Sequence, residues 1–465
     1  MDMPIFKKMW ENKYQIVSER LCGLQNIGAV ATGFNTNIDA VCLLEGKKLQ
    51  HLIENTGLNL DELYHIEHTQ IVNERDFIKG VFKAFTKGIA EEWICLNEKV
   101  YAWIRKELGY DRLQIGGQGG IMANVLSDMG IKKVFAHANS LPKIQAEQFL
   151  PNDNLLSFDE SGDLKPIYKI DRKSDVPLIH FIIEFKKGDL VTVDDKTFKC
   201  PRSNRFIATY DPLNLKLILD ENFMNAIKKQ NLDFVMLSGF HALLEKDEGV
   251  QLIEQFVPRL KEWKDSAKNA IFHIEIASTQ DLAIRRAIIE KLVPIVHSIG
   301  VNERETMDLL NVTDDKGLAQ KCAMQTTAEN LLKGLSKIKE KTGVKRIQLH
   351  MFGLYMTLQD KNFDLSPQDN LKGMLTAAVV AAAKAKTGLT NKQNIQEVRY
   401  DVSDVGLIEL DSLAIALGQP DLALTGIGRY RSWDLIVTPT ILIESPKTLV
   451  GMGDTISSLS LVAAK

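Results

Sequence analysis

Short apolar runs alternate along this chain with longer segments in which apolar residues recur with helical spacing. The short runs have strand character and cover residues 27–34, 121–130, 134–140, 234–240, 270–278, 295–302 and 346–358. Strands separated by helices indicate a mostly parallel sheet that is covered by helices on both faces. The pattern therefore predicts an α/β fold.

Two stretches interrupt this alternation. Residues 42–108 are rich in charged residues and helical in pattern, and residues 165–210 alternate as antiparallel strands do. We expect these stretches to form one smaller α+β lid domain, inserted in two segments into a core made of residues 1–41, 109–164 and 211–465. The alanine-rich segment 374–388 predicts a helix that ends at Gly388 and serves as buried scaffold.

Composition points to small-molecule partners. The chain has 465 residues, of which 45% are apolar, and this is enough for a large core. The 57 basic and 60 acidic residues nearly cancel, so no overall field favours nucleic acid or a membrane surface. The five cysteines show no CxxC spacing, and no apolar stretch has the length of a membrane span. We expect a cytoplasmic protein.

The sequence GMGD, residues 451–454, lies between a strand pattern and the last predicted helix. Glycines at a helix N-terminus let an anion approach the free backbone N–H groups, and Asp454 could take a proton from an attacking hydroxyl. This combination suits phosphoryl transfer to an alcohol. A plain glycine turn is the alternative. A dinucleotide-binding turn would need a third glycine where Ile456 stands, and no GxxxxGK[ST] phosphate loop occurs.

Two acidic motifs follow neighbouring strand patterns. His273 and Glu275 lie on one face of the strand FHIEIAS, where they form either a structural pair or part of a divalent-cation site. Glu305 follows Asn302 by three residues in VNERE, a spacing typical of a helix-capping box. The same spacing aims Glu305 at the carboxyl edge of the sheet, where α/β proteins bind ligands.

Polar residues also gather near the N-terminus. TGFNTNIDAV places Asn35, Asn37 and Asp39 just after a strand pattern, and residues 116–120, GGQGG, precede a helical pattern. Turn chemistry explains either motif alone. Together they suit a polyhydroxylated substrate, whose hydroxyls need several directional partners.

With these motifs in order, the chain resembles the ADP-dependent sugar kinases of the ribokinase-like superfamily, the archaeal-type glucokinases and phosphofructokinases. The resemblance rests on NTNIDA, GGQGG, PRSNRFIA, the HxE of FHIEIAS, the NxxE of VNERE and GMGD, and it extends over nearly the whole chain. It implies a ribokinase-like core, a smaller lid that closes over the sugar, and ADP as the phosphoryl donor.

The resemblance also implies roles for individual residues. Asp454 would be the catalytic base, and the backbone amides of Gly451, Met452 and Gly453 would form the anion hole. Mg²⁺ would be organised by Glu275 and Glu305, largely through water. Further contacts are implied for the sugar, at Asn35, Asp39, Gly117 and Gln118, and for the nucleotide phosphates, at Arg205.

The acceptor is less narrowly defined by these residues. Glu92 and His180 resemble glucose-binding lid residues, whereas the basic residues of segment 165–175 suit the 6-phosphate of fructose 6-phosphate: Lys165, Lys169, Arg172 and Lys173. A solvated charge run is the alternative for that segment. We expect conversion of fructose 6-phosphate to fructose 1,6-bisphosphate in glycolysis, with glucose as a second substrate. The alternatives are an ADP-dependent glucokinase, an ATP-dependent ribokinase-like kinase, and a non-catalytic nucleotide or sugar sensor.

Overall fold

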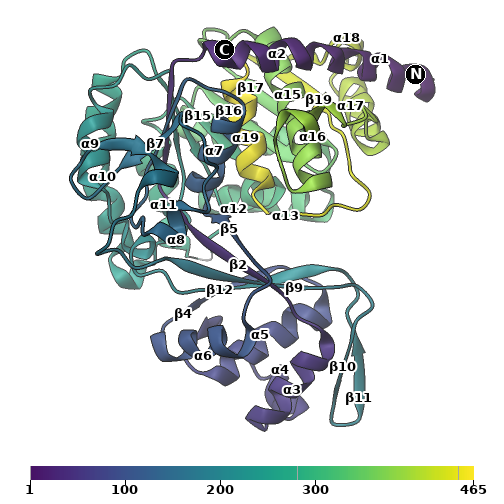
Figure 1. Cartoon of the computed structure of the whole chain (residues 1–465). Coiled ribbons are helices and arrows are strands. Elements are labelled where there is room, and N and C mark those ends of the chain that lie inside the picture. The colour runs from purple at the N-terminus through teal and green to yellow at the C-terminus, as the bar shows by residue number, and fades with distance from the viewer. Residues whose placement is uncertain (1, 280, 449) are drawn as a thin grey trace.

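The computed structural model describes residues 2–279, 281–448 and 450–465, and it contains a large unit and a smaller unit (Figure 1). The large unit is built on one eleven-stranded sheet. Its strands, in spatial order, are β18 (Ile427–Tyr430), β19 (Trp433–Pro439), β17 (Leu354–Gln359), β16 (Arg346–Met351), β15 (Ser298–Val301), β14 (Ile271–Glu275), β13 (Phe234–Leu237), β1 (Ala29–Gly33), β6 (Lys133–Ala136), β7 (Leu155–Phe158) and β8 (Leu164–Pro166).

The seven strands from β16 to β7 are joined by parallel ladders, and antiparallel strands extend the sheet at both ends. Every residue of β1, β13, β14 and β15 is buried, because layers of chain cover both faces of the sheet. The predicted α/β fold is confirmed. Because parallel strands end at one common edge, this order brings the ends of β1, β13, β14 and β15 together.

The helices of the large unit are α1 (Met3–Lys13), α2 (Val17–Gly23), α7 (Gln118–Asp128), α8 (Lys143–Ala146), α9 (Glu221–Ile227), α10 (Gly249–Ser266), α11 (Leu282–Ala287), α12 (Glu303–Val312), α13 (Lys316–Met324), α14 (Ala328–Thr342), α15 (Pro367–Thr387), α16 (Lys392–Gln396), α17 (Asp404–Ala416), α18 (Pro420–Thr425) and α19 (Met452–Val462). The alanine-rich helix α15 ends at Gly388 in the left-handed conformation, as predicted. Both α15 and α7 pack against α19.

One predicted strand is wrong, because residues 121–130 lie mainly in helix α7. This helix is buried almost all round, so its sequence lacks a polar face, and a short apolar run of this kind does not distinguish a buried helix from a strand.

The smaller unit has a six-stranded sheet with helices packed against one face (Figure 1). Its strands, in spatial order, are β3 (Gln70–Ile71), β4 (Glu91–Cys95), β12 (Asn204–Thr209), β9 (Ile179–Phe185), β2 (Asn37–Leu43) and β5 (Arg112–Gly116). Its other elements are α3 (Gly46–Thr56), α4 (Leu60–Tyr64), α5 (Glu74–Lys87), α6 (Glu98–Leu108) and the hairpin of β10 (Leu190–Val193) and β11 (Lys196–Lys199).

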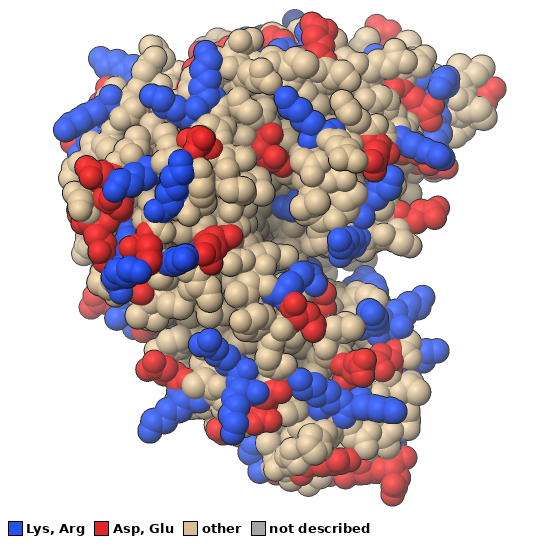
Figure 2. All heavy atoms as spheres, in the orientation of Figure 1, with Lys and Arg blue, Asp and Glu red and all other residues tan. Residues whose placement is uncertain are grey.

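The two faces of this sheet differ in polarity. Ile38, Phe181 and Phe206 belong to the apolar core that the sheet shares with its helices. Side chains alternate along a strand, so the neighbouring residues Asp39 and His180 lie on the opposite face, and these two residues pair across β2 and β9. The polar face lies at the junction with the large unit, where the molecular surface is hollowed (Figure 2).

The observed strands change the boundaries between the predicted core and the predicted lid domain. Strands β2 and β5 place residues 37–41 and 112–116 in the smaller sheet, whereas β8 pairs with β7 at the edge of the large sheet. Residues 165 and 166 therefore belong with the large unit. In the described residues, no helix is both long and apolar enough to cross a membrane.

Candidate active site

The GMGD turn forms the N-terminus of α19. Gly451 has φ 66° and precedes the first helical residue, and a Cβ atom there would lie 2.7 Å from the Ile121 side chain. A side chain at Gly453 would approach His350 Nε2 to 3.1 Å. Glycine therefore keeps the surface over the first-turn N–H groups open, and these groups form a cradle for an anion.

Asp454 lies in the first turn of this helix, and 7% of its surface is exposed. Burial raises the pKa of its carboxyl group to about 6, although the positive charge of Lys384 and a hydrogen bond with Gln118 lower it. A carboxylate with a pKa near 6 is mostly ionised at neutral pH and is still basic enough to accept a proton. Its chemistry fits the predicted general base.

Lys384, on α15, was not predicted to belong to the site. Its ammonium group donates hydrogen bonds to the Gly451 carbonyl oxygen at 3.1 Å and to Thr455 Oγ1 at 3.0 Å. The sequence carried one signal for it, a lysine that interrupts the small apolar residues of α15. The helix interpreted as scaffold thus brings a cation to the turn.

An acidic cluster lies at the carboxyl ends of the central strands. Glu275 ends β14, Glu305 starts α12 and His350 lies on β16, and each offers a ligand atom within 4.8 Å of the others. Burial, together with the neighbouring carboxylates, raises the pKa of Glu305 to about 8 and that of Glu275 well above its ordinary value. The cluster lacks positive charge, so it fits a divalent cation.

The contacts of these residues support the same view. Glu275 Oε2 is buried and accepts no well-formed hydrogen bond from the described residues, and the nearest basic group is His273 Nε2 at 3.6 Å. Glu305 Oε2 accepts a hydrogen bond from the Asn302 backbone N–H at 2.8 Å, so the predicted capping box is present. Glu305 thus caps α12 and also faces the cluster. His273 hydrogen-bonds to two serine hydroxyls, Ser298 and Ser457, and this contact set is structural.

His350 was missed by the sequence interpretation. It shares one face of β16 with Arg346 and Gln348, because side chains two residues apart along a strand point the same way. Three polar residues at alternate positions of an otherwise apolar strand are the signal that could have identified it.

The predicted sugar-binding residues line the polar face of the smaller sheet and its junction with the large unit. Asp39 accepts a hydrogen bond from Asn37 Nδ2 at 2.9 Å, and Thr209 Oγ1 donates to Glu92 at 2.7 Å. His180 Nε2 lies 2.9 Å from Asp211 Oδ2, and this carboxylate contributes to the raised pKa of His180. The sheet thus presents carboxylates and an imidazole to the junction.

The glycine-rich turn before α7 completes this side of the site. Gly117 has φ 73°, and a Cβ atom there would lie 2.5 Å from the Asn35 carbonyl oxygen, so the two segments meet closely. Gln118 Oε1 accepts a hydrogen bond from the Gly239 N–H at 3.2 Å. Because Gln118 also hydrogen-bonds Asp454, it connects the glycine-rich turn before α7 to the GMGD turn.

Two further residues of this region were missed. Asp211 holds His180, as described above. His241 follows β13, and burial lowers the pKa of its imidazole, with smaller effects from the charges of Glu92 and His180. Each follows a predicted strand at a polar position, and that placement is the available signal.

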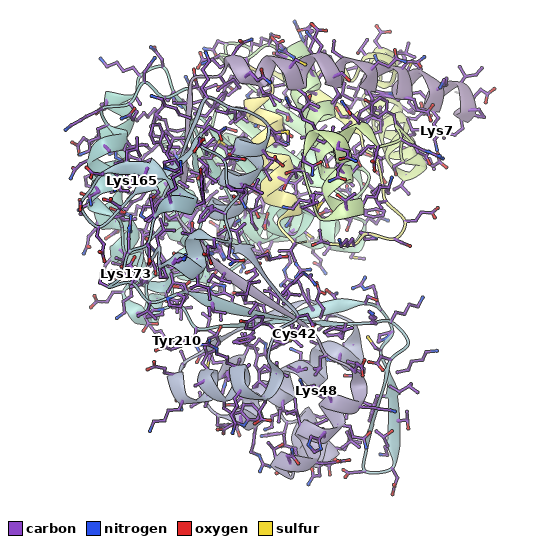
Figure 3. The ribbon with its side chains drawn as sticks, in the orientation of Figure 1. Lys7, Cys42, Lys48, Lys165, Lys173 and Tyr210 are labelled. Carbon is purple, nitrogen blue, oxygen red and sulfur yellow. The ribbon has the colours of Figure 1, made fainter. Side chains whose placement is uncertain are left out.

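The predicted phosphate-binding segment 165–173 does not join the site. Lys165 and Lys173 lie on the flank of the large unit (Figure 3), where they pair with Asp159 and Asp171. Lys169 pairs with Asp153 at 3.0 Å.

The fourth residue of the segment has a structural role. Arg172 is buried, pairs with Asp220 at 2.5 Å, and donates to the Phe158 carbonyl oxygen at 2.9 Å. In the structure the three lysines thus form exposed ion pairs and Arg172 a buried one, and phosphate binding by this segment stays a prediction.

Arg205 lies on β12 with its side chain on the polar face of the smaller sheet. Burial raises the pKa of Asp39, and the charge of Arg205 opposes this rise slightly. Among the described residues Arg205 has no carboxylate partner within 4 Å, so its charge is available to a ligand.

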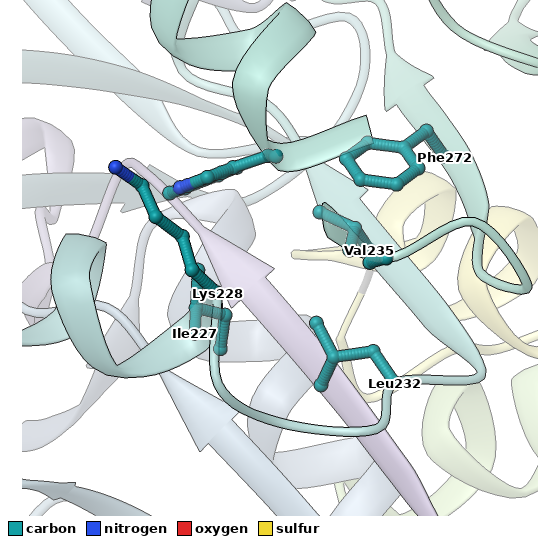
Figure 4. Close-up of a pocket in the computed structure, with 7 residues that line it drawn as sticks. Ile227, Lys228, Leu232, Val235 and Phe272 are labelled. Carbon is teal, nitrogen blue, oxygen red and sulfur yellow. The ribbon is translucent and has the colours of Figure 1, made fainter. Parts of the chain in front are cut away.

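An apolar crevice elsewhere is unrelated to this site. It lies beside α9, α10 and the sheet (Figure 4), and it is too narrow to hold a water molecule. It is lined by Ile227, Lys228, Leu232, Val235, Trp263, Ala267 and Phe272.

The fold and the site are typical of a phosphotransferase, since a glycine-rich helix terminus that carries the Asp454 carboxylate lies beside the polar face of a second sheet. Comparison with known proteins narrows this class. Residues 28–463 match the ADP-specific Phosphofructokinase/Glucokinase conserved region. The chain belongs to this family of ADP-dependent kinases, so the predicted enzyme class and phosphoryl donor are confirmed.

Relatives of both acceptor types match nearly the whole chain. The ADP-dependent glucose/glucosamine kinase of Pyrococcus furiosus is 28% identical, and the match covers 99% of this chain and 98% of that protein. The ADP-specific phosphofructokinase of Methanosarcina acetivorans is also 28% identical, with coverage of 95% and 94%. A solved ADP-dependent kinase complex with fructose-6-phosphate and ADPbetaS has a TM-score of 0.84 and 28% identity, with coverage of 98% and 97%.

Proposed function

We propose that this enzyme transfers the β-phosphoryl group of ADP to a primary hydroxyl of fructose 6-phosphate and, as a second acceptor, of glucose. The observation that carries the proposal is the polar face of the smaller sheet, which directs Asp39, His180 and Glu92 toward the junction beside Asp454. A glycolytic role follows from this chemistry, since both products are phosphorylated hexoses.

The proposed step is an in-line displacement. The sugar hydroxyl oxygen forms a bond to the β-phosphorus of ADP, and Asp454 takes the hydroxyl proton. The bond between that phosphorus and the oxygen bridging to the α-phosphate breaks, and AMP leaves with the electron pair. The N–H groups of the GMGD turn hold the transferring oxygens, and Gln118 keeps the Asp454 carboxylate oriented.

Glu275 and Glu305 would hold Mg²⁺ largely through water, beside His350. When bound, the cation would neutralise charge on the phosphate oxygens. The burial of both glutamates and their raised pKa values support this assignment, because a cation would lower the cost of ionising them.

The two acceptors would use different groups of the same sheet. Glu92 is an exposed carboxylate and would accept hydrogen bonds from glucose hydroxyls. Arg205 has a charge available for a phosphate, and beside Asp39 it would contact the 6-phosphate of fructose 6-phosphate or the phosphates of ADP.

A coupled assay of ADP and ATP against fructose 6-phosphate and glucose tests the proposal. Turnover of both sugars with ADP, at rates well above those with ATP, is the expected result. If neither sugar is phosphorylated with ADP, the proposed function fails. The Arg205→Met variant shows which phosphate Arg205 contacts. A raised KM for fructose 6-phosphate alone indicates a contact with the 6-phosphate of the sugar. A raised KM for ADP with both sugars indicates a contact with the nucleotide.

A further inference from the structure

Lys384 is the charged residue beside the proposed base that the mechanism above does not use. Its partners are the Gly451 carbonyl oxygen and Thr455 Oγ1, which lie on either side of Asp454 in sequence. The carboxylates whose charges act on it are Asp454 of α19 and Asp39 of β2. The lysine thus lies where the GMGD turn meets the acceptor side of the site.

The turn does not need an ammonium group to satisfy its hydrogen bonds. The Gly451 carbonyl oxygen already accepts from Thr455 Oγ1 at 2.7 Å and from the Thr455 N–H at 3.1 Å. Lys384 is also partly buried, and burial lowers its pKa to about 8, so holding a charge at this position is unfavourable. A neutral side chain would pack here at lower cost. A charged lysine at this position is explained if its ammonium group serves an anion that binds at the turn.

We propose that Lys384 is a positioning residue for phosphoryl transfer, which holds the Gly451–Asp454 turn and supplies the positive charge that keeps Asp454 ionised. The inference rests on the proposed function, since it concerns the same base and the same anion-binding turn. Lys384 acts through the turn and through Asp454, and it needs no contact with the sugar.

Lys384→Met tests this role, because methionine has a similar length and no charge. Lys386→Met is the matched control, since Lys386 is exposed on the same helix two residues away. We expect Lys384→Met to lower kcat at pH 7 about tenfold or more, with the KM for sugar nearly unchanged. The acid limb of its kcat profile should move to higher pH, because Asp454 loses a neighbouring positive charge. Lys386→Met should behave as wild type.

The wild-type enzyme provides a second measurement that needs no variant. Its kcat should fall as the pH rises through about 8, because Lys384 then loses its charge, and this alkaline limb should be absent from Lys384→Met. A wild-type profile that stays level through this range overturns the inference, as does a folded Lys384→Met enzyme with unchanged kcat and an unmoved acid limb. A wild-type enzyme inactive on every sugar instead refutes the proposed function.

Discussion

Replacing Asp454 with asparagine should lower activity and raise stability at the same time. Asparagine keeps the size of the side chain and the open cradle of the turn, but it accepts no proton. Because general-base catalysis contributes about 10²–10⁴-fold, kcat should fall by at least two orders of magnitude while the affinity for ADP changes little. The wild-type kcat should fall about tenfold between pH 7 and pH 5, since a group with a pKa near 6 is then mostly protonated.

The stability change follows from the same carboxyl group. Its folded-state pKa is raised from 3.8 to about 6, so the folded protein binds this proton more tightly than the unfolded chain does. The ionised form therefore destabilises the fold above pH 6, by up to about 3 kcal/mol, and this cost disappears as the pH falls below 4. Asp454→Asn removes the cost at neutral pH.

Urea denaturation of both proteins at pH 7 and pH 4, combined with steady-state kinetics, measures these effects. The midpoint of Asp454→Asn should exceed that of wild type at pH 7, and the difference should shrink at pH 4. Wild-type turnover in the variant would exclude Asp454 as the base. A lower midpoint at pH 7 would show that its charge is stabilising, contrary to the reasoning from burial.

Other changes test the remaining assignments. Glu305→Gln should raise the Mg²⁺ concentration needed for half-maximal activity and leave the unfolding midpoint nearly unchanged, because glutamine also completes a capping box; an unaltered Mg²⁺ titration would leave Glu305 with its capping role alone. Glu92→Ala should abolish glucose phosphorylation and largely preserve turnover of fructose 6-phosphate, and equal losses on both sugars would contradict a glucose-specific contact. Combined neutralisation of Lys165, Lys169 and Lys173 should leave the KM for fructose 6-phosphate within about twofold, because their ammonium groups are already paired with carboxylates on the flank of the large unit; a large increase would support the predicted phosphate contact. X-ray scattering should show a more compact particle with ADP and sugar than without, and superimposable curves would argue against closure of the smaller unit.

The sequence predicted the α/β core and the glycine-rich turn before α19, because both depend on local pattern. Parallel strands and glycine turns have signatures within about ten residues. The sequence interpretation failed for α7, because this helix is buried on nearly all sides and so lacks the alternation of apolar and polar faces that identifies a surface helix. It also failed for His350, Lys384 and His241, since each joins the site from an element whose own sequence reads as core or connection.

The basic segment 165–173 shows that the number of basic residues in a segment does not by itself identify a phosphate-binding site. Its side chains looked available because the sequence does not reveal their partners, and the fold brings Asp153 and Asp220 to two of them. Only the three-dimensional arrangement separates such paired charges from Arg205, whose charge has no carboxylate partner among the described residues. Tertiary pairing, not local composition, decides which cations can bind a ligand.

The chain passes between the two sheets next to β2, β5, β9 and β12, and the acceptor-side residues lie beside these crossings. Asn35 and Asp39 flank the first, Gln118 follows the second, His180 follows the third and Asp211 follows the fourth. Any rotation of the smaller unit about this hinge moves the nearest residues least and the far helices and β10–β11 most. The acceptor-side residues can thus stay nearly fixed while the outer part of the smaller unit rotates. Substitutions far from the hinge can therefore alter the rotation of the smaller unit without altering the residues that contact the acceptor.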